Sequence, residues 1–524
     1  MKKILALVLS LVLLGSMMGS SLAEVDLAAY APVEGKVYPF TYVTQSGPVN
    51  GEGPVVKIVE EEFGVDITFW DAGFGATRTY LGAGDVPDVF AIQLDDMVHF
   101  AREGLLAEIP NEVLQKYMPY MYDLWTSISP EMDLWKVDGK NYSLPTMDPE
   151  VGGASYPTIF RGDWLEALGY EKAPTTLEEF EKFAYDVVNK DPDGNGVKDT
   201  YAISSEGIKL IYGAYGCLPT LFVQLEDGTI SHGAIQPQMK EALALLNKWY
   251  ADGLIAPEFV AGEITSSYLS SDFANGKIAV STHDLLAWKG ATWEGARDGV
   301  TYSELKKQNP EAAEKLVWAG PIEGPYGAGN YALHLAKNWM LCFGKQLEDE
   351  PDKMARIMQI FEKYSTTVEG WVFARFGVEG THYDMKPWTY SNGVTVNLPQ
   401  AKGDFGNWFT IVGEGAGTVF DFFSPMTANA ALPERAYLAN EQPYLIDLYD
   451  QGKCYIDALF VKPACWSDYK NELNLMQSTT YAEIITGERP VDDFDAFVEE
   501  WLSYGGQEVL DAVNVNGEGT ILPY

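Results

Sequence analysis

The 524-residue chain carries 36 Lys and Arg against 75 Asp and Glu, giving a formal net charge of −39, and 47% of its residues are hydrophobic. This hydrophobic content is typical of a folded protein rather than a disordered one, and the length is sufficient for more than one domain. The negative charge disfavours nucleic acids and anionic membrane surfaces as partners. Its ordinary consequence is solubility.

The first residues have the pattern of an export signal. Two lysines precede an apolar run, Ile4 to Leu14, which is too short to span a bilayer, and Ser21-Leu22-Ala23 is a small-x-small cleavage pattern. We therefore expect a signal peptide over residues 1–23, with an uncleaved anchor as the alternative. No later segment is apolar enough to cross a membrane, so we predict a secreted protein, extracellular or periplasmic, without stable membrane insertion.

Strand-like and helix-like segments alternate from residue 38 onward. Tyr38–Val43 and Gly64–Trp70 are predicted strands that flank a predicted helix over Pro54–Phe63, and this order implies parallel pairing. Further strands are expected at 88–92 and 157–161, a hairpin at 137–145, a turn leading into a strand at 273–281, and helices at 97–103, 111–124, 163–168, 176–189, 238–251, 352–364, 433–440 and 493–504. The pattern predicts an α/β protein with parallel-rich sheets.

A predicted helix that begins with a capping box, Thr176 and Glu179, ends at an acidic loop over residues 191–200. Oxygen-bearing side chains recur in this loop at positions one, three, five and nine, namely Asp191, Asp193, Asn195 and Asp199. This spacing is typical of loops that fold alternate residues onto a calcium ion.

Two further oxygens complete the predicted calcium site. Val197 can add its backbone carbonyl, and because Ala202 stands where a full EF-hand has a bidentate glutamate, either Thr200 or a water would supply a further oxygen. We predict a structural calcium site that joins the helix to the strand after it. An acidic surface turn without metal is the alternative.

Several short motifs follow one another along most of the chain. They are Gly84-Asp85-Val86-Pro87-Asp88-Val89, Gly104-Leu105-Leu106, Val137 to Pro145, Arg161 to Gly169, Trp249 to Phe259, Phe273 to Ala279, Phe376 to Tyr383 and Ile485-Thr486-Gly487. In this order they resemble the family of extracellular solute-binding proteins of ABC importers, in its large type II-like branch of lipoproteins and oligosaccharide binders. The resemblance extends from Gly84 to Gly487, nearly the whole chain.

The resemblance implies a two-lobed, type II periplasmic-binding-protein-like α/β fold with interleaved lobes and a hinge. We expect lobe 1 at 24–158 and 283–345 and lobe 2 at 159–282 and 346–524, with crossings near 156–161, 279–285 and 341–349. Ser16 stands where many relatives carry a lipobox cysteine, so their lipid anchor is not implied here.

The function implied by the resemblance is non-enzymatic. The lobes of a monomer would close around a small solute, with an oligosaccharide as the favoured ligand, and deliver it to the permease subunits of an ABC transporter. Other sugars, peptides and other small solutes remain open as ligands. The alternatives are a secreted carbohydrate-active hydrolase with paired carboxylates and a surface adhesin without a closable cleft.

Candidate ligand contacts are aromatic and polar residues near the ends of predicted strands or in the aromatic, glycine-rich C-terminal third. Ligands of α/β folds bind beyond strand ends, aromatic planes stack on the C–H faces of sugars, and polar groups bind the hydroxyls. The candidates are Trp70, Asp71, Asp95, Arg161, Trp288, Trp293, Glu379, Trp388 and Trp408. Core packing is the alternative for each tryptophan, and turn stabilisation is the alternative for Glu379.

The four cysteines are compatible with export but specify no metal site. None stands in a CxxC pair, so zinc is not expected, and Cys454 with Cys465 is a candidate disulfide.

Overall fold

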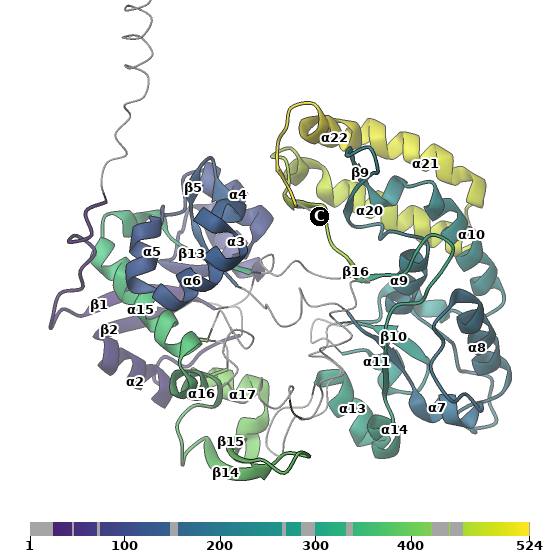
Figure 1. Cartoon of the computed structure of the whole chain (residues 1–524), viewed down its shortest axis with the longest axis horizontal. Coiled ribbons are helices and arrows are strands. Elements are labelled where there is room, and N and C mark those ends of the chain that lie inside the picture. The colour runs from purple at the N-terminus through teal and green to yellow at the C-terminus, as the bar shows by residue number, and fades with distance from the viewer. Residues whose placement is uncertain are drawn as a thin grey trace, which may run out of the picture.

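The computed structural model describes residues 25–44, 47–70, 74–146, 156–264, 269–283, 299–331, 339–417, 419–421, 440 and 454–522. These residues form two halves that lie side by side, each around its own hydrophobic core (Figure 1). We define the first half as residues 25–146 and 339–421, and the second half as residues 156–331 and 454–522, although Phe460, Val461 and Leu522 of the last segment pack in the core of the first half. The helix expected at 433–440 lies outside the described residues, apart from residue 440.

The first half is built on a five-stranded sheet in the order β2-β1-β3-β13-β6. Three neighbouring strands, β1 (Tyr38–Val43), β2 (Val65–Phe69) and β3 (Val89–Gln93), run parallel, and Tyr38 pairs in register with Val65. The other two, β13 (Trp339–Phe343) and β6 (Ser143–Pro145), are antiparallel to their neighbours. The strand–helix–strand unit predicted at the start of the chain is confirmed.

The helix of that unit, α2 (Pro54–Phe63), has the bounds that its sequence predicts. Proline occupies the first turn, where its missing N–H costs nothing, and Gly64 ends the helix at φ 62°, a conformation that glycine adopts without steric penalty. Val55, Val59 and Phe63 lie on its buried face.

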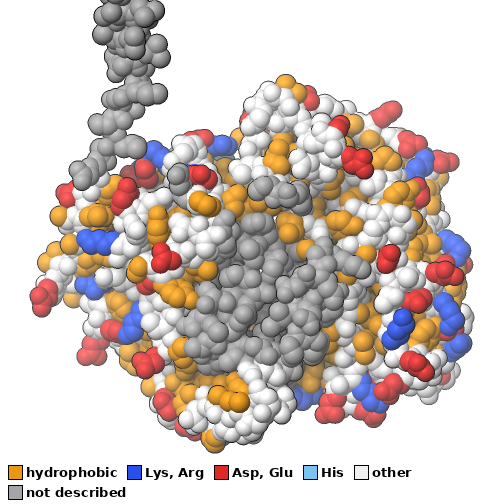
Figure 2. Space-filling view, in the orientation of Figure 1, with side chains coloured by type: hydrophobic (Ala, Val, Ile, Leu, Met, Phe, Trp, Pro, Cys, Tyr) orange, Lys and Arg blue, Asp and Glu red, His pale blue; other side chains and the backbone are white. Residues whose placement is uncertain are grey.

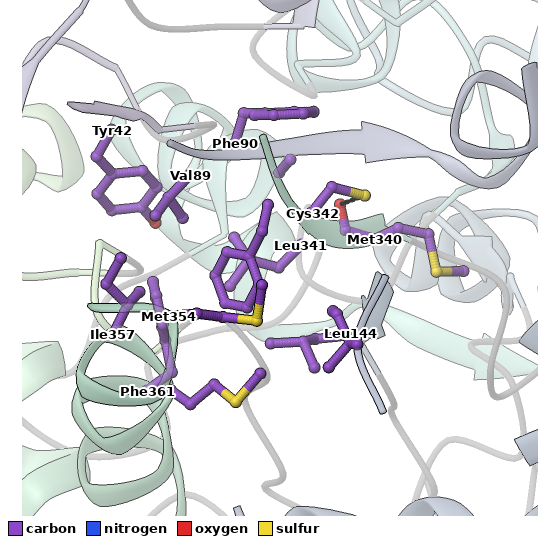
Figure 3. Close-up of a cluster of buried hydrophobic side chains, with 14 of the residues drawn as sticks. Tyr42, Val89, Phe90, Leu144, Met340, Leu341, Cys342, Met354, Ile357 and Phe361 are labelled. Atoms are coloured by element: carbon purple, nitrogen blue, oxygen red, sulfur yellow. Dashed lines mark hydrogen bonds between the residues drawn. The ribbon is translucent and has the colours of Figure 1, made fainter. Parts of the chain in front are cut away.

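The core of the first half joins segments that are far apart in sequence. Helix α15 (Pro351–Thr366) places Met354, Ile357 and Phe361 against residues of β1, β3 and β13 (Figure 3). Each fully buried side chain of this size contributes about 1.5–3 kcal/mol, so the late helix α15 is an integral part of the early sheet.

The sheet of the second half differs from the parallel-rich prediction. Its strands β7 (Thr158–Phe160), β10 (Val280–Thr282) and β11 (Val317–Ala319) are ordered β10-β7-β11, and both pairs are antiparallel. Strands of three residues carry too little periodicity to indicate the direction of their partners. Around this sheet pack α8 (Leu177–Asn189), α9 (Ser205–Ala214) and α10 (Gln238–Ala251).

The capping box of α8 is confirmed in one of its two bonds. Thr176 Oγ1 accepts a hydrogen bond from Glu179 N at 3.2 Å, whereas the Glu179 carboxylate accepts from Thr175 N at 2.9 Å rather than from Thr176 N.

The C-terminal helices cover the second half. They are α20 (Trp466–Thr486), α21 (Phe494–Trp501) and α22 (Gln507–Asn514). The helix predicted over 493–504 ends at Trp501 as an α-helix, because a π-turn at Leu502–Gly506 follows and Gly505 adopts φ 142°.

Further helices and strands are α3 (Phe74–Ala83), α4 (Leu94–Arg102), α5 (Asn111–Tyr117), α6 (Pro119–Ile128), β4 (Lys136–Val137), β5 (Lys140–Asn141), α7 (Gly162–Ala167), β8 (Phe222–Gln224), β9 (Ile230–His232), α11 (Ser271–Ala274), α13 (Val300–Gln308), α14 (Pro310–Glu314), β12 (Asn330–Tyr331), α16 (Val368–Phe376), β14 (Tyr383–Thr389), β15 (Thr395–Ala401), α17 (Trp408–Gly413), β16 (Cys454–Tyr455), β17 (Leu459–Val461) and β18 (Thr520–Ile521).

The halves are interleaved in sequence, but at different positions from those expected. Residues 299–319, expected in lobe 1, belong to the second half, where β11 pairs with β7. Helices α15 and α16, expected in lobe 2, pack in the first core. The chain on both sides of the expected crossing at 279–285 packs in the second half. Amphipathic patterns identify a helix but not which of two similar cores it covers.

The surface and the cysteines complete this description. Figure 2 shows Asp and Glu side chains interspersed with Lys and Arg over the described surface of both halves in that view. No helix within the described ranges has the length and apolar character that membrane crossing requires. Cys454 and Cys465, the candidate disulfide pair, are both free thiols.

Candidate functional site

Polar and aromatic side chains of the first half meet where β3 ends and α4 begins. Arg78, Gln93, Asp96 and Trp339, together with Ile92, line a cavity of about 100 Å³ at this point. Each comes from a different position in the fold: Arg78 from α3, Gln93 from the end of β3, Asp96 from the first turn of α4 and Trp339 from the start of β13. The carboxyl end of a parallel strand is where α/β folds bind ligands.

A partly buried ion pair organises this cavity. Arg78 Nη2 lies 3.3 Å from Asp96 Oδ1, and the Asp96 side chain is 11% exposed whereas that of Arg78 is 53% exposed. Burial raises the pKa of Asp96, and the Arg78 charge opposes that rise. The largely buried Asp96 carboxylate therefore fixes the position of the Arg78 guanidinium. The exposed N–H groups of Arg78 remain able to donate hydrogen bonds to a ligand.

Trp70, a predicted ligand contact, follows the end of β2. The backbone N–H of Trp70 donates to Tyr42 O at 3.0 Å, which continues the pairing of β1 with β2 by one residue. The Trp70 ring lies 5.0 Å from the ring of Tyr80 on α3, at an angle of 66° between the ring planes. The half-buried Trp70 ring therefore lies at the carboxyl edge of the parallel strands, as the Arg78 cavity does. Asp71, the next residue, lies outside the described residues.

Asp95, another predicted contact, faces a second and larger cavity. This space of about 290 Å³ lies between α4, which contributes Asp95, His99 and Arg102, and the chain entering α20, which contributes Lys462 and Trp466. Lys462 Nζ lies 3.1 Å from Asp457 Oδ2 and 3.9 Å from Asp95 Oδ1. Successive helical residues point about 100° apart, so Asp95 and Asp96 line different cavities.

The second half contributes an aromatic stack at the end of β10. The rings of Tyr156 and His283 lie 5.0 Å apart at 25°, and Thr282 Oγ1 donates to Tyr156 O at 3.2 Å. Desolvation lowers the pKa of His283 to about 4 and the charge of Lys209 adds to that effect, so this imidazole is neutral at pH 7.

Arg161 lies in the interior rather than at a ligand-accessible edge. It is 3% exposed, donates to both Asp163 carboxylate oxygens at 2.8 and 2.5 Å, and its guanidinium carbon lies 4.7 Å from the Trp164 ring centre. These contacts join β7 to α7, so the structure gives Arg161 a packing role in place of the predicted ligand contact. Trp164 is a core residue, as predicted.

Of the candidates in the C-terminal third, Glu379 and Trp388 do not line the Arg78 cavity. Glu379 is exposed in the turn that precedes β14, where Gly380 N donates to Tyr383 O at 2.7 Å. Trp388 packs from β14 against a small cluster around Trp371 and Tyr390. Trp408 is the first residue of α17, and its side chain, like Trp288 and Trp293, lies outside the described residues.

The acidic loop is closed by hydrogen bonds among the residues predicted to bind calcium. Asp191 Oδ2 accepts from Gly196 N at 2.9 Å, and the Asn195 amide donates to Asp193 Oδ2 at 2.7 Å and Asp199 Oδ1 at 3.2 Å. Desolvation, and then the neighbouring Asp191 carboxyl, raise the pKa of Asp193. Asp191 Oδ1 is buried without a hydrogen-bond partner in the described part of the chain. A crowded set of carboxylates with one unsatisfied oxygen fits a hard cation.

Two details limit how far this loop is preformed. Thr200 Oγ1 donates to Val187 O at 3.0 Å, so this hydroxyl ties the loop to α8. Within the described residues, no three acidic, histidine or cysteine side chains already converge as a metal cage. Binding of a cation would therefore draw the Asp193 and Asp199 carboxylates inward.

Sequence reasoning missed Arg78 and Trp339. Arg78 stands in a weakly amphipathic helix, and Trp339 reaches the cavity only because β13 pairs with β3, with Trp339 opposite Gln93. That pairing joins residues about 250 positions apart, and no local pattern indicates it. The motif Asp95-Asp96 after a buried strand was the available signal for this edge.

Comparisons with known proteins agree with this geometry. The family model for bacterial extracellular solute-binding proteins matches residues 50–338. The polygalacturonan/rhamnogalacturonan-binding protein YtcQ of Bacillus subtilis is 23% identical over 82% of this chain and 80% of its own. Lipoprotein LipO of the same organism is 20% identical over 89% of each chain.

Solved structures share the fold at low sequence identity. The alginate-binding protein AlgQ2, in a crystal structure without calcium ion, has a TM-score of 0.64 at 17% identity and covers 92% of this chain and 98% of its own. The Streptococcus pneumoniae ABC-transporter substrate-binding protein FusA, in complex with kestose, has a TM-score of 0.62 at 18% identity and covers 90% and 97%. The two-lobed type II solute-binding fold is therefore confirmed.

Proposed function

Because this chain belongs to the bacterial extracellular solute-binding protein family, we propose that it captures an oligosaccharide between its two halves and presents it to an ABC importer. The observation that carries the proposal is the cavity at the carboxyl end of β3, where Arg78, held by Asp96, stands beside Trp339. Trp70, at the end of β2, adds a second aromatic ring at the same carboxyl edge of the sheet. Donors beside aromatic planes are what a sugar ring requires.

The proposed mechanism is closure without covalent chemistry. A ligand that contacts the Arg78 edge of the first half and the Tyr156–His283 edge of the second half favours the arrangement in which both contacts exist. The relative named for polygalacturonan, the solved structure of the alginate-binding protein and the FusA complex with kestose support a glycan as the ligand class. We propose stoichiometric binding without hydrolysis, in contrast to a carbohydrate-active hydrolase.

A calorimetric screen of oligosaccharides tests this function. We expect one glycan class to bind at one site per chain, without release of new reducing ends, and Arg78→Met to weaken that binding at least tenfold, because each lost charge-assisted bond is worth about 1.5–3 kcal/mol. Arg102→Met is the matched control, since Arg102 pairs with Asp138 on the other cavity. Full affinity in Arg78→Met would contradict the site, and glycan turnover would favour the hydrolase.

We also propose that the loop at 191–200 binds calcium through Asp191, Asp193, Asn195, Asp199 and the Val197 carbonyl, in a structural role. The unsatisfied Asp191 Oδ1 supports this. Calcium would neutralise the clustered carboxylates and fix the end of α8 to the chain that follows.

Calcium is expected to raise the melting temperature by about 2–4 °C at millimolar concentration, since ligand binding to the folded state stabilises it by mass action. Asp199→Asn removes one charge at constant shape and should abolish most of this rise. Asp227→Asn, in the exposed turn between β8 and β9, should leave it intact. Equal calcium responses in all three proteins would exclude the loop as the site.

For localisation we propose export through the N-terminal signal, with cleavage after Ala23. The basic start, the short apolar run and the small-x-small pattern at Ser21-Leu22-Ala23 support this.

A further inference from the structure

A buried carboxyl group in the second half joins three elements that are distant in sequence. Glu263 is 3% exposed, and its Oε1 accepts hydrogen bonds from Ser270 Oγ at 2.6 Å and Ser281 Oγ at 2.5 Å. Its Oε2 accepts from Glu206 N at 3.2 Å, in the first turn of α9. One side chain therefore contacts the cap of α11, the middle of β10 and the start of α9.

Other bonds fix the same junction from both sides. The backbone N–H of Glu263 donates to Ser205 Oγ at 2.8 Å, so residues 205–206 and 263 are bonded reciprocally. Ser270 Oγ also accepts from Phe273 N at 3.3 Å as the N-cap of α11, and Ser270 N donates to Thr301 Oγ1 at 3.0 Å on α13. The carboxyl group is the centre of this network, and its protonation state decides which groups can donate.

The charges around Glu263 do not neutralise it. On α9, Glu206 faces it, and the Glu206 charge is itself paired with Lys209 at 2.7 Å. On α11, Asp272 pairs with Lys277 at 3.6 Å. Beyond the end of β10, His283 has a lowered pKa and is neutral at pH 7. Within the part of the chain that the structure describes, the packed elements thus give this carboxylate hydroxyl and amide donors but no dedicated cation.

We propose that Glu263 is a proton-binding switch: with its proton bound it holds α9, α11 and β10 together, and loss of the proton loosens them. A neutral acid can be buried at low cost, whereas an unpaired buried carboxylate is expensive even with three donors. β10 leads directly to His283, so the loosened strand is the one that carries the aromatic edge of the second half. The switch does not depend on which ligand binds.

The titration of Glu263 supports this geometry. Burial raises its pKa from 4.5 to about 7, and the two serine hydroxyls oppose the rise. A carboxyl group whose folded-state pKa is raised contributes stability that is complete below its unfolded pKa and is lost as pH rises through the folded value. The stability that the bound proton contributes therefore begins to fall near pH 4.5 and levels off about one pH unit above the folded value, near pH 8.

Amide hydrogen exchange of the full chain tests the proposal. After correction for intrinsic exchange rates, the protection of residues 271–274 and 280–282 should fall about tenfold between pH 6 and pH 8.5. Glu263→Gln, which stays neutral, should remove this dependence. Glu362→Gln is the matched control: Glu362 in the first half is half-buried, burial raises its pKa to about 7, and it accepts from Tyr120 N, so its loss should leave residues 271–282 pH-dependent.

Ser281→Ala gives an independent reading if Glu263→Gln folds poorly. Removing a donor that lowers the pKa of Glu263 should move the midpoint of the exchange transition to higher pH, a shift that a purely structural role would not produce. Protection that is constant with pH in the unmodified protein, or an unmoved midpoint in Ser281→Ala, would overturn the proposal.

Discussion

Replacing Arg375 with methionine is expected to lower the free energy of unfolding by about 3–5 kcal/mol, because it breaks a buried ion pair from one side. Arg375 Nε on α16 lies 2.8 Å from Asp421 Oδ2, and the two side chains are 15% and 0% exposed. Without the guanidinium, the fully buried Asp421 carboxylate loses this ion pair. Urea denaturation, followed by the fluorescence of the tryptophans, measures the loss.

Two further variants separate the ion pair from packing. Arg375→Met combined with Asp421→Leu should recover a large part of the stability, since buried pairs are often replaced by apolar residues at little cost. Lys402→Met removes an exposed pair, 3.4 Å from Asp384, and should change stability by no more than about 0.5 kcal/mol. A single Arg375→Met variant as stable as Lys402→Met would contradict the burial of this pair.

Gly213→Ala is expected to cost about 3 kcal/mol, at the upper end for overpacking. Gly213 lies in α9, and a Cβ there would stand 2.0 Å from Gly329 O, a backbone atom that cannot rotate away. Tyr455 Oη also donates to Gly213 O at 3.1 Å, so α9 is held against the chain segments on both sides. The midpoint of urea unfolding should fall while its slope stays unchanged.

Gly82→Ala is the matched control for this close approach. Gly82 also lies inside a helix, α3, but a Cβ there would meet no atom within 4 Å. Alanine is favoured over glycine in helix interiors by about 0.5–1 kcal/mol, so this variant should be stabilised. Opposite signs for the two substitutions would establish the contact with Gly329, whereas equal gains would contradict it.

Local patterns predicted most elements of the fold but not their partners. The bounds of β1, α2 and α10 agree with the sequence because each element has a clear periodicity and end signals, such as Pro54 and Gly64 around α2. The placement of α15 in the first core depends on contacts with β1 and β3, which lie about 260–320 residues earlier in the chain. Such contacts are settled by shape and volume, which periodicity does not encode.

The residues of the candidate ligand site could be predicted from the sequence only where they stand at the end of a predicted strand. Trp70 and the Asp95-Asp96 pair follow strands that were predicted, so the carboxyl edge could be located. Arg161 follows a predicted strand too, but the adjacent Asp163 and Trp164 take up its guanidinium. The sequence contained these neighbours, yet whether the group turns inward depends on the position of α7 against the sheet.

The alternation of the chain between its two halves affects how the protein can be made. The first core is incomplete until Leu522 has been synthesised, because Phe460, Val461 and Leu522 belong to it, and the second requires Val513. Neither half corresponds to a continuous fragment, so expression of residues 1–331 alone should give an aggregation-prone product with two unfinished cores. Nascent chains of this protein therefore remain without a closed core until late in translation.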